Sequence, residues 1–186
     1  MPDTIRYEDG APLAATAAGA WDAPPSHARF SLRLRPGDGL PAIAGLPLAL
    51  PVNRSAGHGS WLMARLGPDE WFLKGPHQEG EVMAAEAAAR LEGRFFALAD
   101  ISHRHAAFAV NGPHAAAVLN AGCALDLHLA AFPPGAAART LLGKAEILLL
   151  RAGEMSFSVE CWRSFGPYVR QFLATAAAFE AALAAR

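Results

Sequence analysis

The sequence predicts an α+β fold made of two similar halves of antiparallel sheet plus helices, and three observations lead to this prediction. Residues 60–76 and 145–162 each carry largely apolar segments on both sides of a turn that contains glycine, which is typical of a β-hairpin. An alanine-rich stretch with helical character follows each hairpin, at 78–93 and at 164–186. The two hairpins align with an offset of 86 residues. Each half is therefore expected to hold a strand, a hairpin and a helix on one side of a sheet.

The composition fits a compact chain of this kind and limits what it can bind. The 186 residues are 53% apolar and 18% charged, with a formal net charge of −1. Because the basic residues are scattered, no general attraction to nucleic acid or anionic lipid is expected. No stretch approaches the roughly 18 apolar residues of a membrane span, and the opening MPDTIRYEDGAPLAA lacks the apolar core of a secretory signal. With two cysteines and no disulfide framework, a cytoplasmic location is expected.

Three segments are expected along the chain. Residues 1–28 are rich in Ala, Pro, Gly and Asp without periodicity, and they are predicted to form a flexible N-terminal arm or a segment laid along a surface. The first α+β half is predicted at 29–98 and the second at 99–186. The repeat is one of element order, since few identities accompany it.

The first half is predicted from alternation, proline and glycine. FSLRL alternates as a strand does, and the Pro-rich stretch that follows can hold only short strand pieces. In the hairpin turn GPDE, proline pre-sets the first central position. Gly93 follows the end of a helix of about four turns. The expected elements are a strand at 30–34, strand pieces within 37–53, the hairpin 60–76, a helix at 78–93 and a strand at 94–101.

The second half follows the same order. Pro113 in the first turn and Gly122 at the stop delimit a short helix, and Gly153 occupies the hairpin position of Gly67. The expected elements are a strand at 105–110, a helix at 111–122, a strand and a hairpin within 138–162, and a helix at 164–186. The apolar set of the last helix is predicted to share one face, and its members are Phe165, Tyr168, Val169, Phe172, Ala176, Phe179 and Leu183.

Cys123 and His128, in NAGCALDLHLAAFPPG, are the first candidates for chemistry. A zinc site needs about four ligands, usually with close pairs of Cys or His, and no second pair is present. A nucleophilic cysteine needs a base placed by the fold and a polarising environment, which the sequence around Cys123 does not indicate. Cys161 lies on the apolar face of SFSVECW, where a buried inert cysteine is usual. No metal site is therefore expected.

The segment DISHRH superficially suggests a triad. Along a strand, however, Asp100, Ser102 and Arg104 would lie on one side, and His103 on the other with Ile101 and His105. A hydrogen-bonded strand turning into the next is the simpler interpretation, and contact with a polar ligand or partner is the functional one.

No Gly-x-Ser-x-Gly elbow and no phosphate-binding glycine motif is present. GHGSW is only a fragment of a dinucleotide pattern, and it precedes the strand that it should follow. The residues themselves therefore predict a fold without a self-sufficient active site, and no catalytic residue is assigned.

Four arginines surround the second hairpin, and they could hold a carboxylate or a partner, although a solvated edge is the simpler interpretation. They are Arg139, Arg151, Arg163 and Arg170.

Several stretches in order resemble the gamma subunit family of heterotetrameric bacterial sarcosine oxidase. They are LGPDEWFL (66–73), DISHR (100–104), NGPHAAAVLNAGCALDL (111–127), FPPG (132–135), ART (138–140) and RSF (163–165). Single pieces also occur in the folate-binding group of the glycine-cleavage T-protein, and the combination GCALDL, FPPG and RT is the specific part. The first 55 residues carry none of these motifs, and the Pro-rich stretch at 37–53 departs from the pattern.

The resemblance implies a folate-binding, aminomethyltransferase-like fold in a subunit with no catalytic residue of its own. The complex would oxidatively demethylate sarcosine to glycine and pass the one-carbon unit to tetrahydrofolate. It would carry FAD, FMN and NAD on its other subunits, while this chain alone binds no cofactor and packs against the alpha subunit, with beta and delta in the complex. Expected partner-interface candidates are Asp100, Ser102, His103, Arg104 and Arg163.

A free-standing one-carbon carrier or transferase of the T-protein type is the alternative hypothesis. It requires a carboxylate to hold the pterin in a deep pocket, and Asp100 is the candidate. Saturable binding of tetrahydrofolate that is lost in Asp100→Ala would favour it.

Overall fold

The computed structural model describes residues 4–7, 27–35, 37 and 39–185. The chain divides into two compact units. The unit called here the 25–103 unit is Pro25–His103, and the one called the 104–186 unit joins Arg104–Arg186 with Met1–Pro24. Of the predicted arm, Thr4–Tyr7 forms a strand and His27 and Ala28 begin another; the rest lies outside the described residues.

The 25–103 unit is a five-stranded antiparallel sheet with one main helix. Its strand order is β5-β6-β7-β2-β8. A two-stranded sheet of β3 and β4 lies in the Pro-rich stretch. The elements are β2 (His27–Leu34), β3 (Ala42–Ile43), β4 (Leu46–Pro47), β5 (Arg54–His58), β6 (Trp61–Gly67), β7 (Glu70–Pro76), the 3-10 helix η3 (His77–Glu79), α1 (Gly80–Arg90) and β8 (Phe96–Asp100).

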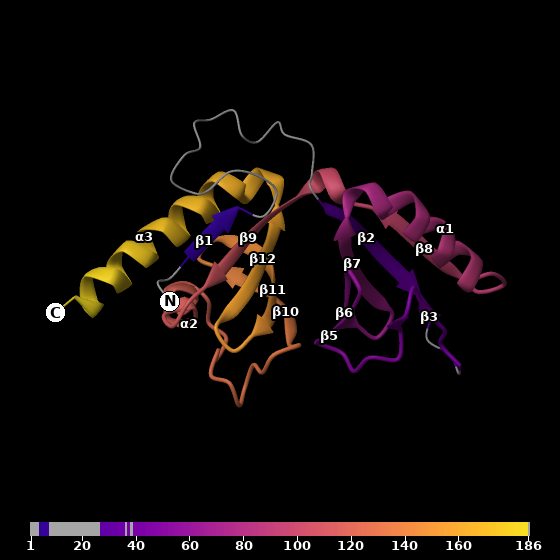
Figure 1. Ribbon diagram of the computed structural model, residues 1–186, viewed down its shortest axis with the longest axis horizontal. Coiled ribbons are helices and arrows are strands. Elements are labelled where there is room, and N and C mark those ends of the chain that lie inside the picture. Colours follow the sequence, from indigo (N-terminus) through magenta and orange to yellow (C-terminus); the bar gives the residue numbers. More distant parts are fainter. Residues whose placement is uncertain (1–3, 8–26, 36, 38, 186) are drawn as a thin grey trace. The chain divides into compact units, whose positions relative to one another are not determined.

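The 104–186 unit has a second five-stranded antiparallel sheet, with the order β1-β9-β12-β11-β10. Helix α3 contacts β9 and β12, and Figure 1 shows it along this sheet. The elements are β1 (Thr4–Tyr7), β9 (His105–Asn111), α2 (Ala115–Asn120), β10 (Ala137–Leu142), β11 (Ala145–Gly153), β12 (Ser156–Trp162), the 3-10 helix η5 (Arg163–Phe165) and α3 (Gly166–Ala184). The 3-10 helix η4 (Ser102–Arg104) spans the boundary between the units.

The two sheets repeat each other strand by strand. Read from the other edge, the second order is β10-β11-β12-β9-β1, which matches β5-β6-β7-β2-β8 position for position. Each hairpin has a register shift at the same place, before Gly67 and before Gly153. Each second hairpin strand leads through a 3-10 turn into a helix that starts at a buried glycine, Gly80 or Gly166. The predicted α+β fold with two similar halves is therefore confirmed.

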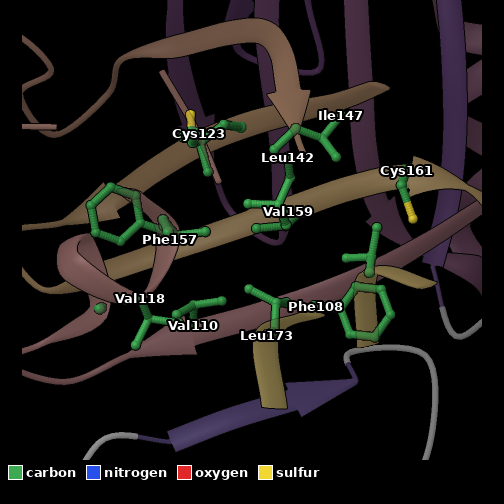
Figure 2. Close-up of a cluster of buried hydrophobic side chains, with 14 of the residues drawn as sticks. Phe108, Val110, Val118, Cys123, Leu142, Ile147, Phe157, Val159, Cys161 and Leu173 are labelled. Carbon is green, nitrogen blue, oxygen red and sulfur yellow. The ribbon is translucent and has the colours of Figure 1, made fainter. Parts of the chain in front are cut away.

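Each unit has its own apolar core between one sheet face and the helices. In the 25–103 unit alternate residues of β2, such as Phe30 and Leu32, pack with Trp71 and with Met83 of α1. In the 104–186 unit the core joins β9, β11 and β12 to α2 and α3. Figure 2 shows this second cluster, in which Cys123 and Cys161 are among the apolar side chains. The sequence prediction that Cys161 is buried is confirmed.

The last helix differs from its prediction. Val169, Leu173 and Ala176 are buried, but Tyr168 and Phe179 of the predicted apolar face are exposed. The buried residues of α3 are Gly166, Val169, Leu173 and Ala176. At 3.6 residues per turn, Gly166 and Leu173 lie to one side of the predicted stripe, so the buried face is rotated from the predicted one. Strand β5 was not predicted, because RSAGH has neither alternation nor β-branched residues.

Candidate functional site

Asp100 and Ser102 form a hydrogen-bonded lock at the end of β8. The Asp100 Oδ1 atom accepts from the Ser102 backbone N–H at 2.8 Å and from the Ser102 hydroxyl at 2.6 Å. The Ser102 Oγ atom accepts from the backbone N–H of Arg29 at 2.9 Å, and the Arg29 carbonyl accepts from the N–H of Ile101 at 2.8 Å. The lock therefore fixes the exit of β8 against β2, and Ser102 is almost fully buried within it.

This geometry replaces the alternation expected for DISHRH. The strand ends at Asp100 and residues 102–104 form a 3-10 turn, so the side chains do not divide between two faces of one strand. An acceptor side chain beside free N–H groups favours such a turn over continued strand pairing.

We expect Asp100→Ala to lower the free energy of unfolding of the chain by about 1–2 kcal/mol, because the Ser102 hydroxyl and amide lose their acceptor in a buried setting. Urea denaturation followed by circular dichroism measures this change. Asp126→Ala, which removes an exposed acceptor for the His128 N–H, is the matched control and should cost less. Equal costs for the two variants would contradict a special role for the lock.

His103, Arg104 and Arg163 are placed differently from the lock. His103 and Arg104 are exposed, and Arg163 is half-buried in η5. The guanidinium carbon of Arg104 lies 5.2 Å from the ring centroid of Trp162, whose side chain is 47% exposed. Stacking of this kind holds an arginine flat and leaves its N–H groups available in the plane. The five predicted interface candidates thus fall into two groups. Asp100 and Ser102 form a structural pair, and the other three are surface side chains that can contact a partner.

Cys123 and His128 have unrelated surroundings. The Cys123 thiol is buried, with the Thr140 hydroxyl 3.9 Å away. His128 is exposed, and its Nδ1 atom accepts from the Ala130 N–H at 3.3 Å in the following turn. In the part of the chain that the structure describes, no three His, Cys, Asp or Glu side chains gather in a way that could hold a metal ion.

Two arginines anchor the hairpins, and sequence reasoning missed their role. Arg151 is 4% exposed and donates to the carbonyls of Leu127 and Phe132 at 2.7 Å each, and to Gly153 at 3.1 Å. Its second terminal nitrogen donates to the Glu154 carbonyl. The side chain also lies over Phe157, with 4.7 Å to the ring centroid. The interpretation of Arg151 as part of a solvated edge is therefore wrong.

Arg65 makes the same contacts in the first hairpin. It donates to the carbonyls of Gly67 at 3.2 Å, and of Pro68 and Leu50 at 2.7 Å each. Its guanidinium carbon lies 5.1 Å from the Trp71 ring centroid. An arginine two residues before the aligned glycine and six before an aromatic, in both hairpins, is the signal that could have revealed the pair. Burial lowers the pKa of Arg151, while the nearby Glu154 carboxylate raises it.

A buried acid and an imidazole face each other in the second sheet. Glu160 is fully buried, and its Oε2 atom lies 3.8 Å from the Nδ1 atom of His105. This distance exceeds that of a hydrogen bond. The two residues come from neighbouring strands, β12 and β9, and Glu160 projects from the sheet face opposite to the core residues Val159 and Cys161.

The hollows lined by described residues include three that are large enough for a small ligand or a partner side chain. One of about 510 Å³ lies beside the start of α1 and includes Asp100, His77 and Glu81. A second, of about 440 Å³, is strongly apolar and lies along α3 between Tyr168 and Phe179. A third, of about 560 Å³, lies at the start of β8. None of these hollows brings a nucleophile and a base together.

None of the helices within the described ranges is both long and apolar enough to cross a membrane.

Two solved structures share this fold. The glycine cleavage system aminomethyltransferase T from Bartonella henselae matches with a TM-score of 0.66 and 14% identity, over 92% of this chain and 45% of its own. A chain of the heterotetrameric sarcosine oxidase from Corynebacterium sp. U-96, solved with pyrrole 2-carboxylate, matches with a TM-score of 0.78 and 27% identity, over 95% of this chain and 84% of its own. The fold is thus of the aminomethyltransferase-like class.

The family follows from sequence comparison. The model of the sarcosine oxidase gamma subunit family matches residues 41–179, and the chain belongs to that family. Sarcosine oxidase subunit gamma of an Arthrobacter species is 36% identical over 115 residues, which are 62% of this chain and 55% of that one. The subunit gamma of Corynebacterium sp. strain P-1 is 33% identical over 129 residues, which are 69% of this chain and 62% of that one. The match thus spans little more than half the length of these relatives.

Proposed function

We propose that this protein is a non-catalytic gamma-type subunit of a heterotetrameric sarcosine oxidase and packs against the large alpha subunit, with beta and delta completing the assembly. In this proposal the complex demethylates sarcosine to glycine oxidatively and transfers the one-carbon unit to tetrahydrofolate. The observation that carries the proposal is the family match over residues 41–179. The structural likeness to a chain of a heterotetrameric sarcosine oxidase supports it.

FAD, FMN and NAD would belong to the other subunits of the assembly. The glycine segment GHGSW, which resembles a fragment of a dinucleotide loop, covers the end of β5, the turn after it and the first residue of β6, so a strand and not a helix follows it. A pyrophosphate site needs the N-terminus of a helix directly after such a loop. This segment therefore does not fit a dinucleotide, and we derive no chemical step from one.

A tagged pull-down of the full chain from its own cells, followed by a visible spectrum of the eluate, tests the proposal. Large partner chains that co-elute with flavin absorption are the expected result. Elution of the chain alone and colourless would overturn the subunit role.

We expect Arg163→Ala to weaken subunit association by roughly 30-fold, because truncating an interface arginine often costs about 2 kcal/mol. The fold of the isolated chain should remain intact, since Arg163 is half-buried in a short 3-10 turn. Titration of tagged variant chains against the partner subunits, with circular dichroism on each variant, measures both effects. Arg139→Ala, at an exposed position of β10, is the control. Unchanged association would remove Arg163 from the interface.

A second candidate function is binding of tetrahydrofolate by this chain. Asp100 favours it, because this exposed carboxylate lines the hollow beside α1. Calorimetric titration of the full chain with tetrahydrofolate, and of Asp100→Ala, tests it. No binding at millimolar folate would exclude this candidate without affecting the subunit proposal. We place the complex in the cytoplasm, where sarcosine catabolism meets one-carbon metabolism. Cys123 and Cys161 are buried and form no disulfide, which agrees with a reducing compartment.

A further inference from the structure

Strand β8 is an edge strand without the usual protection. Among the described residues it pairs with β2 alone, from Phe30↔Asp100 to Leu34↔Phe96, without a register shift. Natural edge strands carry Lys, Pro, bulges or inward charges that prevent pairing with other chains. The sequence of β8, FALAD, has none of these except the acid at its end. By contrast, edge strand β5 carries Arg54 and His58, and edge strand β10 carries Arg139.

The hydrogen bonds beside β8 show which of its amides point outward. The N–H of Ile101 donates to the Arg29 carbonyl, and the N–H of Arg35 donates to the Phe95 carbonyl. In an antiparallel pair the residues that bond to the partner alternate with those that do not. Odd-numbered residues of this strand therefore bond to β2, and the backbone groups of Phe96, Leu98 and Asp100 face the open edge.

An exposed aromatic side chain lies at the start of the same edge. Phe95 is 89% exposed, which is more than any other large apolar side chain that the structure describes. It lines the hollow of about 560 Å³, together with Phe96, Ala97 and two arginines. Buried aromatic anchors next to arginine are typical of the energetic centres of protein interfaces.

The charges around the hollow lined by Phe95 indicate which chemical group a bound partner would place there. Arg33 already forms ion pairs with Asp69 at 3.2 Å and Glu70 at 3.1 Å. Arg35 is exposed at the rim, and no ion pair of Arg35 is found within the described residues. A carboxylate would complement it. A second copy of this chain would offer from its own β8 only Asp100, whose Oδ1 atom already holds Ser102.

The geometry points to a docking surface for another protein chain: an extended segment pairs with the outer edge of β8, covers Phe95 with an apolar side chain, and places a carboxylate at Arg35. Main-chain hydrogen bonds supply affinity in this mode, and side-chain pockets supply specificity. The inference deepens the proposed subunit role and rests on it, since it names the surface by which the subunit meets its partner.

Hydrogen exchange of the full chain, alone and in the assembly recovered from its own cells, tests this surface. Amides of Phe96, Leu98 and Asp100 should exchange rapidly in the chain alone and at least 10-fold more slowly in the assembly. Slow exchange in the chain alone, or exchange in the assembly equal to that of the free chain, would overturn the proposal. A dimer of the free chain that Phe95→Asp dissolves would assign the edge to a second copy instead.

Recovery of partner chains by tagged variants gives an independent readout. Phe95→Asp and Ala97→Lys should each reduce recovery at least 10-fold, because they place a charge on the edge without removing a buried contact. Val82→Asp, a 69% exposed position on α1 of the same unit, should recover partners as the unmodified chain does. Normal recovery by Phe95→Asp, or equal loss by Val82→Asp, would exclude this surface. If the unmodified chain recovers no partner, the subunit role itself fails, so the two failures are distinguishable.

Discussion

Replacing Arg151 by methionine is expected to lower the free energy of unfolding by about 3–5 kcal/mol, because the buried carbonyls of Leu127 and Phe132 would lose their donor. Each buried acceptor left without a partner costs about 1–3 kcal/mol, and Arg151 serves four backbone carbonyls in all. Methionine preserves much of the apolar contact with Phe157. Urea denaturation of the full chain, followed by circular dichroism, measures the loss.

Two further variants test the role of the arginine side chain. The first distinguishes the planar guanidinium, with its several N–H donors, from the positive charge alone. Arg151→Lys keeps the charge but cannot reach carbonyls on several sides at once, so it should recover less than half of the lost stability. Arg65→Met removes the equivalent side chain in the first hairpin, where the guanidinium is partly exposed. It should cost less than Arg151→Met, because water can replace the donor at Pro68. An Arg151→Met variant as stable as the original chain would contradict the anchoring role.

Arg65 and Arg151, which anchor the two hairpins, illustrate what the sequence could and could not predict about the fold. Hairpins and helices followed from local alternation, proline and glycine, and the 86-residue offset identified the repeat. The role of Arg151 depends on carbonyls up to 24 residues away, at Leu127, and a single sequence gives no account of such distant acceptors. Strand β5 was missed for a similar reason, since its pairing with β6 and not its own side chains makes RSAGH a strand.

In the candidate site, too, local features could be predicted from the sequence, and contacts with distant residues could not. The grouping of Asp100 with Ser102 was predicted from their proximity in DISHR, but their lock depends on the backbone of Arg29, 73 residues from Ser102. The stacking of Arg104 on Trp162 joins residues 58 positions apart. Phe95 drew no attention as a sequence feature, because an apolar residue next to Phe96 in RFFALAD is expected to enter a core. Its exposure is a property of the loop before β8 and follows only from the structure.

The surfaces also bear on the proposed subunit role. Exposed large apolar side chains occur on both units, including Phe95 on one and Phe179 on the other, at 89% and 63% exposure. Side chains of this kind are compatible with the docking of partner chains, which the proposed subunit role expects.

Gly75→Ala is expected to lower the free energy of unfolding by about 3 kcal/mol, because a methyl group there would overlap the indole of Trp61. An ideal Cβ at Gly75 would lie 2.2 Å from the Trp61 Cδ2 atom. The indole cannot move away easily, since it stacks on Phe30 and its N–H donates to Glu79 at 2.9 Å. Urea denaturation measures the cost. Gly57→Ala, whose added Cβ would meet the Trp61 carbonyl oxygen at an ordinary 3.5 Å, is the control and should change stability little.

A double-mutant cycle identifies the collision as the cause. In a Trp61→Leu background the space beside Gly75 is free, so Gly75→Ala should cost about 2 kcal/mol less than it does in the original chain. If the cost is the same in both backgrounds, the effect arises from the β7 backbone and not from the indole. If it vanishes in the Trp61→Leu background, the glycine at 75 exists to admit the tryptophan. The core of the 25–103 unit would then depend on a contact between β6 and β7 that neither residue's local sequence reveals.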